Sequence, residues 1–218
     1  MKKFAVIGLG KFGFHVAKAL YEDHNEVVAI DADPSRVQAI DPYSSEALVM
    51  DSTDKEALQA LGLERMDGVI VSTGTNIAVS ILLCQYLVEL GVKRIMIKAI
   101  NDDHATILQR LGATEVIHPE RDVALRIAHS LSMPNILDFI PLSKDFELIQ
   151  VGPPAEFLGK TLKDLNLRHK YNVHVIAIKD SGTEAFRLVP SADYIIRAED
   201  ILIMLGKIED IQKIRDLR

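Results

Sequence analysis

Short apolar runs alternate with helical patterns along the first two thirds of the chain. Six runs rich in Val, Ile and Met start 23, 21, 21, 26 and 21 residues apart. Because apolar residues are nearly continuous within each run, the runs predict strands buried on both faces of a parallel sheet. The runs are Lys3–Ile7, Glu26–Asp31, Ala47–Asp51, Gly68–Ser72, Arg94–Lys98 and Glu115–Ile117.

Helix signals lie between these runs. Asp33 and Pro34 supply an N-cap and a first helical residue before Ser35–Ile40. Glycines follow the last periodic residues of three other segments, where a helix commonly ends; they are Gly62, Gly91 and Gly112. A strand and a helix repeated about every 21 residues predict βαβ units with right-handed crossovers. The predicted fold class is therefore α/β, with a Rossmann-like, doubly wound parallel sheet.

The rhythm changes after His118-Pro119, and the rest of the chain predicts a small α+β module. We expect domains at 1–132, which binds nucleotide, and 133–218, which holds a linker or interface helix and the module. The expected helices are Asp122–Leu131, a short piece at Asn135–Ile140, Leu158–Asn166 and Ile208–Leu217. The expected strands are Leu148–Val151, His174–Lys179 and Ile201–Leu205, with a turn at 180–182.

Composition narrows the class of protein. The 218 residues are 48 % hydrophobic, enough for a core without staples, and the net charge of −6 does not favour nucleic acid. The single cysteine, Cys84, excludes an internal disulfide and fits a reducing compartment. The uncharged stretch Gly68–Val88 has the length of a membrane span, but its polar residues and Gly74 favour a strand, a turn and a buried helix. We expect a soluble protein.

A glycine motif follows the first strand and opens the first helix. In Gly8-Leu9-Gly10-Lys11-Phe12-Gly13, the first glycine permits a tight turn, Gly10 admits a pyrophosphate, and Gly13 allows close helix–sheet packing. The phosphates would lie at the positive end of the helix. Asp31 closes the second strand 23 residues after Gly8, a spacing that suits a carboxylate bound to ribose hydroxyls.

Asp31 also bears on which nucleotide binds. A carboxylate repels a 2′-phosphate, so NAD(H), ATP or ADP is favoured over NADP(H). We expect this carboxylate near the surface, so that Asp31→Ala would abolish binding and leave the fold intact. Further candidates follow later strands, where ligands of such sheets bind, although each also has an ordinary role in a turn or as a solvated lysine. They are Asp51, Ser52 and Thr53, then Ser72, Thr73 and Gly74, then Lys98.

Glu120, in His118-Pro119-Glu120-Arg121-Asp122, has two interpretations. It is an acid that favours a helix N-terminus, or it is a ligand of Mg²⁺ or Ca²⁺ that bridges nucleotide phosphates.

Catalytic motifs are missing from the sequence. No Tyr-x-x-x-Lys, HExxH, GxSxG or P-loop occurs, and the seven histidines have no metal-binding spacing; His129 and His174 fit structural roles better than catalytic ones. Binding without turnover is therefore favoured, and the protein is predicted not to be an enzyme. The alternatives are an NAD-dependent oxidoreductase of unknown substrate and a redox-sensing repressor, for which no basic helix-turn-helix is present.

Several segments together resemble a known family. VIGLGKFG, VVAIDAD, VMDSTD, VIVSTGTN, IKAIND and IHPERD, followed by LKDLNLRHKYNVHVIAIK and ADYIIRAEDILIMLG, are similar to the RCK (regulator of K⁺ conductance) subunits of Ktr/Trk potassium uptake systems. The resemblance covers essentially the whole chain. One N-terminal and one C-terminal module make the chain similar to the short Ktr type and unlike the tandem Trk type.

The resemblance implies a cytoplasmic gating subunit. Such subunits form homodimers that assemble into a homo-octameric ring beneath a membrane-embedded, KtrB/TrkH-like transporter, and ATP, ADP or NAD(H) changes the angle between paired subunits. The resemblance places ribose on Asp31, Lys98 and His104 near the nucleotide, and a divalent cation on Glu120 at the dimer interface. Lys11 stands where relatives often have an arginine that reaches the partner's γ-phosphate, and lysine lacks the bidentate fork.

The resemblance also implies a second ligand. Arg168 and Asn172, beside the apolar Val173 and Val175, lie where some relatives bind cyclic di-AMP, although His174 interrupts the apolar stretch. The predicted cofactor-binding residues are Gly8, Gly10, Lys11, Phe12, Gly13, Asp31, Ala32, Asp33, Asp51, Ser52, Thr53, Thr73, Gly74, Lys98 and His104.

Overall fold

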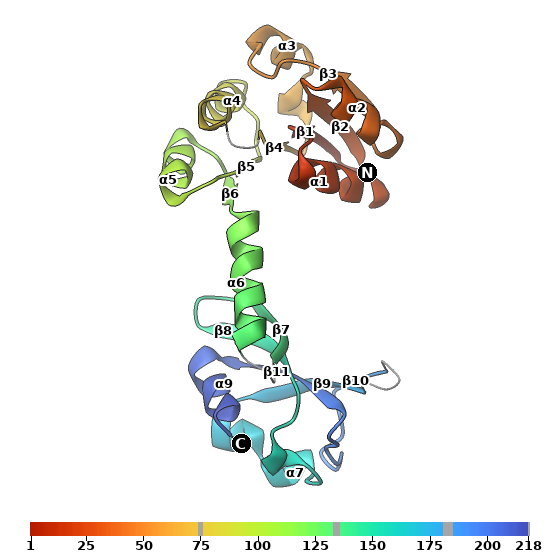
Figure 1. Cartoon of the computed structure of the whole chain (residues 1–218), viewed down its shortest axis with the longest axis vertical. Coiled ribbons are helices and arrows are strands. Elements are labelled where there is room, and N and C mark those ends of the chain that lie inside the picture. The colour runs from red at the N-terminus through yellow and green to blue at the C-terminus, as the bar shows by residue number, and fades with distance from the viewer. Residues whose placement is uncertain (74–75, 133–135, 181–184, 218) are drawn as a thin grey trace. The chain divides into compact units, whose positions relative to one another are not determined.

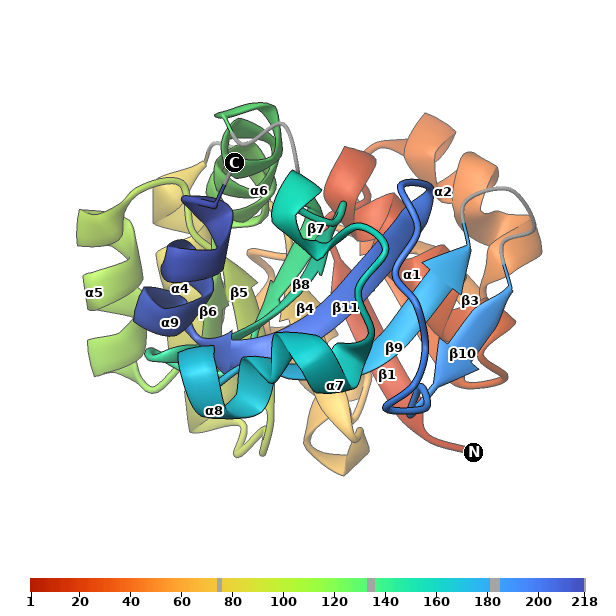
Figure 2. The same cartoon turned by 90° about the horizontal axis from the view of Figure 1, so that it is seen from below.

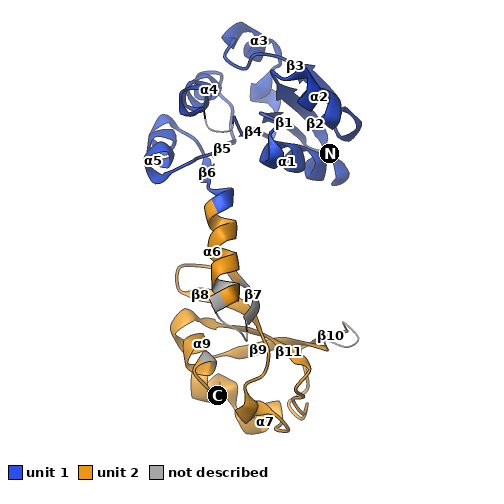
Figure 3. Ribbon diagram, in the orientation of Figure 1, with its two compact units in different colours: residues 1–120 blue, residues 121–218 orange. Residues whose placement is uncertain are grey.

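The computed structural model describes residues 1–73, 76–132, 136–180 and 185–217 (Figure 1). Its contacts divide the chain into two compact units, Met1–Glu120 and Arg121–Arg218 (Figure 3). The predicted boundary after residue 132 stays a prediction: it falls at the end of α6 (Pro119–Ser132), whereas the division between the units falls in the first turn of that helix.

Unit 1 contains a six-stranded sheet in the order β3-β2-β1-β4-β5-β6, with every pair of neighbours parallel. This order and direction confirm the predicted doubly wound fold. The strands are β1 (Lys3–Ile7), β2 (Glu26–Asp31), β3 (Glu46–Val49), β4 (Gly68–Val71), β5 (Ile95–Lys98) and β6 (Glu115–Ile117). The helices between them are α1 (Lys11–Glu22), α2 (Pro34–Ile40), α3 (Lys55–Ala60), α4 (Ile77–Glu89) and α5 (Asp102–Leu111).

Two apolar layers cover the sheet of unit 1. On one face, α1 and α2 pack on β1, β2 and β3, around a core that includes Val6, Ala17 and Ile40. On the other face, α4 packs on β5 and α5 on β6, around a core that includes Leu83 and Leu108 (Figure 1). Each large aliphatic side chain that is fully buried in this way contributes about 1.5–3 kcal/mol.

The expectation of strands buried on both faces is met by only part of the sheet. All of β4 and most of β1 and β2 are buried, but β5 alternates. Ile95 and Ile97 are buried under α4, whereas Met96 and Lys98, which point to the α1 side, are only partly covered. An open hollow of about 150 Å³ lies on this side, lined by Phe4, Val16, Leu20, Gly68, Val69, Ile70, Arg94 and Met96. Apolar composition alone does not distinguish a strand that is covered twice from one that is covered once.

Unit 2 is built on an antiparallel five-stranded sheet in the order β10-β9-β11-β8-β7. Figure 2 shows β8, β11 and β9 running alongside one another. The strands are β7 (Ile136–Pro141), β8 (Phe146–Val151), β9 (His174–Asp180), β10 (Phe186–Leu188) and β11 (Asp200–Lys207). The helices are α7 (Leu162–Leu165), α8 (Leu167–Tyr171) and α9 (Ile208–Arg215). Ile149, Leu202 and Ile211 belong to one buried cluster that joins the sheet to the helices.

Two helix predictions in this half are wrong. The piece expected at Asn135–Ile140 is the strand β7, because its backbone pairs with β8, with Phe139 opposite Ile149; Asn135 itself lies outside the described residues. Of the helix expected at Leu158–Asn166, only Leu162–Leu165 forms. The preceding residues pair instead with the chain near Ile196, through the N–H of Gly159 and the carbonyl of Lys160. Tertiary pairing thus overrides local helical pattern.

The other predicted elements form, with differences at their ends, whereas α8 and β10 were not predicted. The uncharged stretch forms β4 and α4, and no helix in the described part of the chain is long and apolar enough to cross a membrane. Asp33 and Pro34 begin α2 as predicted. The helix expected at Asp122–Leu131 starts earlier, with Pro119 as its first residue, a position that tolerates the missing N–H. The turn expected at 180–182 lies largely outside the described residues.

Two glycines of the first turn should respond differently to a methyl group. A Cβ on Gly13 would lie within 3.0 Å of the Gly8 carbonyl oxygen, whereas a Cβ on Gly10 meets nothing within 4 Å. We expect Gly13→Ala to destabilise unit 1 by about 1–3 kcal/mol or more, and Gly10→Ala by less than about 1 kcal/mol. Thermal unfolding of the two variants measures the difference, and equal midpoints would contradict the assigned close approach.

Candidate nucleotide site

The first glycine turn lies where the strand order reverses, between β1 and β4. Gly8 has a φ of +92°, and its N–H donates to the carbonyl of Ile30 at 2.8 Å. A Cβ there would lie within 3.0 Å of the Ser72 carbonyl oxygen, at the end of β4. Only glycine combines this φ with so close a neighbour. The turn therefore opens a crevice at the carboxyl ends of the strands, the usual ligand position in such sheets.

The helix after this turn differs from its neighbours at its N-terminus. The helices α2, α3, α4 and α5 each begin with a side-chain cap, from Asp33, Asp54, Asn76 and Asn101. In contrast, α1 has Gly10 at the N-cap, without a side-chain hydrogen bond, and its first turn contains no acid and begins with Lys11. Because no side chain of α1 caps its first N–H groups, an anionic ligand can bind them.

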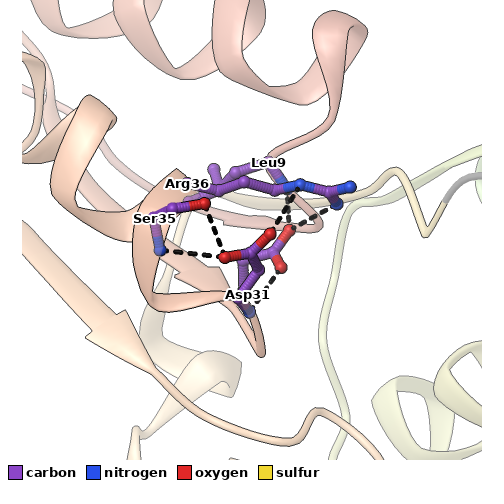
Figure 4. Close-up of polar contacts among 5 residues, drawn as sticks. Leu9, Asp31, Ser35 and Arg36 are labelled. Carbon is purple, nitrogen blue, oxygen red and sulfur yellow. Dashed lines mark hydrogen bonds and ion pairs between the residues drawn. The ribbon is translucent and has the colours of Figure 1, made fainter.

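Asp31 closes β2 beside this turn (Figure 4). Its Oδ2 accepts the N–H of Leu9 at 2.6 Å, and its Oδ1 accepts the N–H of Asp33 at 2.9 Å. The guanidinium of Arg36 lies 3.4 Å from Oδ2. The Asp31 side chain is only 9 % exposed, so the expectation of a carboxylate near the surface is wrong. Its two backbone contacts make it part of the turn as well as a potential ligand.

These groups line one cavity of about 430 Å³. Its lining residues are Gly8, Gly10, Ile30, Asp31, Ala32, Arg36, Asp51, Ser52, Thr53, Ser72, Thr73, Asn76 and Val79. Two carboxylates, Asp31 and Asp51, lie in it. The N–H and hydroxyl of Thr53 donate to Asp51 and hold the pKa of its carboxyl below the ordinary value, so Asp51 is ionised at neutral pH. The cavity thus combines acidic acceptors with the uncapped end of α1.

Most of the predicted nucleotide residues come together here, but not all line the cavity. Lys11, Phe12 and Gly13 lie in the first turn of α1 outside the lining, and Asp33 caps α2 through the N–H of Ser35. Gly74 lies outside the described residues. Ile30, Arg36, Asn76 and Val79 line the cavity without having been predicted, and Ser72, a candidate named from its place after the fourth strand, lines it too. The sequence could have identified Arg36 as a candidate, because a residue five positions after Asp31 falls in the first turn of α2, next to the end of β2.

Lys98 lies at the end of β5, outside this lining. Its ammonium group contacts the carboxylate of Glu120, and this contact holds the pKa of Glu120 below its ordinary value. The Lys98 side chain is 14 % exposed and that of Glu120 is 70 % exposed. Both possible roles of Glu120 remain compatible with this position, because it lies in the first turn of α6 and its carboxylate reaches the strand ends.

His104 is buried in α5 and faces α4, outside the cavity lining. Its Nδ1 accepts the N–H of Ile100 at 3.4 Å, so the proton is assigned to Nε2, which donates to the hydroxyl of Ser80 at 2.8 Å. Ser80 in turn donates to the carbonyl of Ile77. Burial, and secondarily the charge of His118, lowers the pKa of His104. The neutral ring therefore joins α5 to the first turns of α4.

Unit 2 has a pocket of about 310 Å³ beside α8. Its lining residues are Leu162, Lys163, Asn166, Leu167, Arg168, His169, Val173, His174 and Val175. Arg168 belongs to this lining. Asn172 does not; it ends α8 with a φ of +54°.

Metal ligands do not cluster in the described part of a single chain. No group of three or more His, Cys, Asp or Glu side chains within it could hold an ion.

Comparison with known proteins agrees with the division of the chain into the units Met1–Glu120 and Arg121–Arg218. Residues 4–119 match the TrkA-N domain family, and residues 146–218 match the TrkA-C domain family. The chain is 44 % identical to Ktr system potassium uptake protein C of Bacillus subtilis (strain 168) over 212 residues, which are 97 % of this chain and 95 % of that protein. It is 37 % identical to Ktr system potassium uptake protein A of the same organism, over the same shares.

Solved structures give the same fold. The GsuK RCK domain matches with a TM-score of 0.68 at 16 % identity, over 99 % of this chain and 47 % of that one, so the chain spans about half of that structure. The TrkA-N domain of the inner membrane protein YbaL of Escherichia coli matches with a TM-score of 0.54 at 20 % identity, over 60 % of this chain and 96 % of that one.

The buried His104 should make stability depend on pH. Its folded pKa lies below its unfolded value of about 6.5. The unfolded state therefore takes up a proton first, and folding stability falls as pH falls below that value. We expect His104→Gln, whose amide can still donate to Ser80, to show a smaller loss of unfolding midpoint between about pH 7.5 and 5.5.

The exposed His169 serves as the matched control. His169→Gln should keep the pH dependence of the wild-type chain. If the unfolding midpoint of His104→Gln fell with pH as steeply as that of wild type, titratable groups other than His104 would be responsible for the pH dependence.

Proposed function

The chain belongs to the TrkA-N/TrkA-C family together with the Ktr potassium uptake proteins, and on this premise we propose that it is a nucleotide-binding gating subunit of a potassium transporter. The observation that carries the proposal is the cavity at the strand ends, which has carboxylate acceptors on one side and the uncapped end of α1 on the other. A nucleotide complements this arrangement, because its sugar hydroxyls can donate to the carboxylates and its anionic phosphates can bind the end of α1.

The residues of the cavity fit an adenosine nucleotide. Asp31 would accept from the ribose hydroxyls, and the glycine turn with Lys11 would hold the phosphates. Asp31 and Asp51 together disfavour a further phosphate on the ribose, so ATP, ADP or NAD(H) is favoured over NADP(H). A solved structure described as a GsuK channel bound to NAD shares this fold, with a TM-score of 0.53 at 20 % identity.

Binding without turnover suits the same residues. The titratable side chains that line the cavity are Asp31, Arg36 and Asp51, and the pKa of Asp51 is lowered. None of the three is a histidine, cysteine, tyrosine or lysine, the groups that exchange a proton most readily near neutral pH. The lining therefore favours a regulatory ligand over the alternative of an NAD-dependent oxidoreductase.

Assembly with further copies of the chain is part of the proposal. In a doubly wound sheet, the helix after β6 would return over the α1 side of β4 and β5, where this unit has its open hollow. Here that helix is α6, and it carries four exposed apolar side chains. They are Val123 at 44 %, Leu125 at 52 %, Ile127 at 52 % and Leu131 at 80 % exposure. A homodimer would cover these side chains, and such a dimer is the unit from which the family resemblance implies an octameric ring.

The partner and the place of action follow from the family. The Bacillus subtilis relatives are components of Ktr potassium uptake systems. We therefore place the ring in the cytoplasm, at the inner face of the membrane, against a KtrB/TrkH-like transporter subunit. Gating requires only that the nucleotide binds one shape of the ring better than another, and about 5.5 kcal/mol would move the equilibrium from 1:99 to 99:1.

A divalent cation fits a single chain poorly. Glu120 is paired with Lys98, and the described residues supply no cluster of ligands around it. A cation on Glu120 would need the oxygens of a phosphate or of a second copy. Mg²⁺ or Ca²⁺ at the dimer interface, held by Glu120 together with such oxygens, is part of the proposal.

Cyclic di-AMP is the proposed second ligand. The pocket beside α8 combines cationic side chains, Arg168 and Lys163, with the apolar Val173 and Val175, a combination that suits a dinucleotide. Asn172 would act from the end of α8, and His174 belongs to the lining.

Asp31→Asn tests the nucleotide site. The asparagine keeps the size but removes the charge, and its single amide oxygen can accept only one of the N–H groups of Leu9 and Asp33. Each hydrogen bond to a charged group is worth about 1.5–3 kcal/mol. We expect at least a tenfold loss of affinity for ADP and NADH in calorimetry, while Asp23→Asn, an exposed control, retains wild-type affinity. Asp31→Ala would in addition destabilise the fold by about 1–3 kcal/mol, since the N–H groups of Leu9 and Asp33 lose their acceptor. If Asp31→Asn bound ADP and NADH as tightly as wild type, the proposal that ribose contacts Asp31 would be wrong.

Ile127→Glu tests the assembly. A charge in the exposed apolar row of α6 would be buried without a partner in a dimer, which is strongly unfavourable. We expect the variant to shift toward the 24.2 kDa monomer in light-scattering measurements of mass. Arg126→Glu, which places the same carboxylate one residue away and changes the net charge by two units instead of one, should stay closer to the wild-type mass. A wild-type chain that is itself monomeric would contradict the proposed dimer.

A further inference from the structure

Arg36 forms the border between two cavities of unit 1. It lines the nucleotide cavity and also a shallower hollow of about 400 Å³ between α1 and α2. The second hollow is lined by Leu9, Gly10, Lys11, Phe14, His15, Ser35, Arg36 and Ala39. Neither the sequence motifs nor the proposed function assigns a role to this arginine.

The contacts of Arg36 hold its guanidinium in place at one edge. Nη1 donates to Oδ2 of Asp31 at 3.4 Å, and Nε lies 3.5 Å from Oδ2 of Asp33 (Figure 4). Guanidinium N–H bonds lie in the plane of the group, so the hydrogen bond to Asp31 leaves the flat faces open. The side chain is 52 % exposed, and a ligand in the cavity can therefore reach it.

The charges around Arg36 argue against a role as an anion site. Asp31 and Asp33 place two carboxylates beside the single guanidinium. A phosphate bound there would meet more negative than positive charge, so the net field opposes it. A neutral, flat and polarizable group does not meet this penalty. Guanidinium planes stack well on such groups, and nucleobases are the usual example.

We propose that Arg36 is the platform on which a purine base stacks when its ribose binds Asp31. This inference rests on the proposed function, because it assigns a position to the base of the same nucleotide. Asp33 keeps the guanidinium tethered after the ribose hydroxyls compete for Asp31. The apolar Ile30 and Val79 supply further contact within the same cavity. Arg36 thereby makes the site selective for purine over pyrimidine nucleotides, since the larger ring system stacks over more area.

The test separates the plane of Arg36 from its charge. Arg36→Lys keeps the charge and loses the plane, and Arg36→Ala loses both. Calorimetric titration with ADP and with UDP should show a roughly 5- to 150-fold loss of ADP affinity in Arg36→Ala, the range of base stacking on a side chain. Arg36→Lys should recover little of this loss. The ratio of ADP to UDP affinity should shrink toward one in both variants.

Controls distinguish a local effect from loss of the fold. Arg65→Lys alters an arginine that is 86 % exposed and lies outside the cavity lining, and it should bind as wild type. Unliganded Arg36 variants should unfold within a few degrees of wild type, because the guanidinium is half exposed, Asp31 keeps its two backbone N–H donors, and ion pairs of exposed groups are worth about 0–1 kcal/mol.

Three results would overturn the proposal. Wild-type ADP affinity in Arg36→Lys would mean that charge alone acts. Tighter binding in Arg36→Ala would mean that the arginine only obstructs Asp31. An unchanged ADP to UDP ratio would remove base selectivity. In each of these cases, the proposed function is still supported as long as the wild-type chain binds ADP. A wild-type chain that binds neither ADP, ATP nor NAD(H) overturns the function and the stacking together.

Discussion

The close approach of backbone at the first glycine turn is the constraint on which the rest of unit 1 depends. The carbonyl of Gly8 lies against Gly13, and Gly8 itself lies against the end of β4. Without side chains at these two positions, α1 can pack near the strand ends while β1 and β4 remain neighbours. The same approach turns the N-terminus of α1 toward the point where the strand order reverses. Packing and ligand geometry therefore have one cause, and neither can be altered alone.

Asp31 shows how tightly the turn and the ligand site are joined. A carboxylate there satisfies the N–H groups of Leu9 and Asp33 before any ligand arrives. Because buried N–H groups are costly to leave unpaired, the acid is needed for the turn as well as for the proposed contact with ribose. The carboxylate is consequently held in one orientation with its remaining lone pairs available. A preorganised acceptor loses little conformational entropy on binding, which favours affinity.

The sequence predicts unit 1 better than unit 2 for physical reasons. Buried parallel strands separated by capped helices have strong local signals, and all six strands were found within a few residues of their ends. The segment before α7 owes its conformation to pairing with the distant chain near Ile196, which no local pattern records, and β7 owes its conformation to antiparallel pairing with the next strand, β8. In the site, the glycines and Asp31 belong to a motif with fixed spacing. Arg36 follows Asp31 by five residues and so has a local signal, whereas Asn76 and Val79 join the site only because the start of α4 converges on it in space.

The uneven covering of the sheet connects the fold to its proposed use. A helix that packed on β4 and β5 would complete unit 1 as an independent domain, but α6 belongs mainly to the second unit. Unit 1 is thus left with an apolar hollow, and α6 with exposed apolar side chains. A contact between copies of the chain would bury both the apolar hollow and the exposed apolar side chains of α6. An interface formed in this way would lie on the same sheet whose strand ends form the candidate nucleotide site, so a ligand that shifted those ends would change the interface directly.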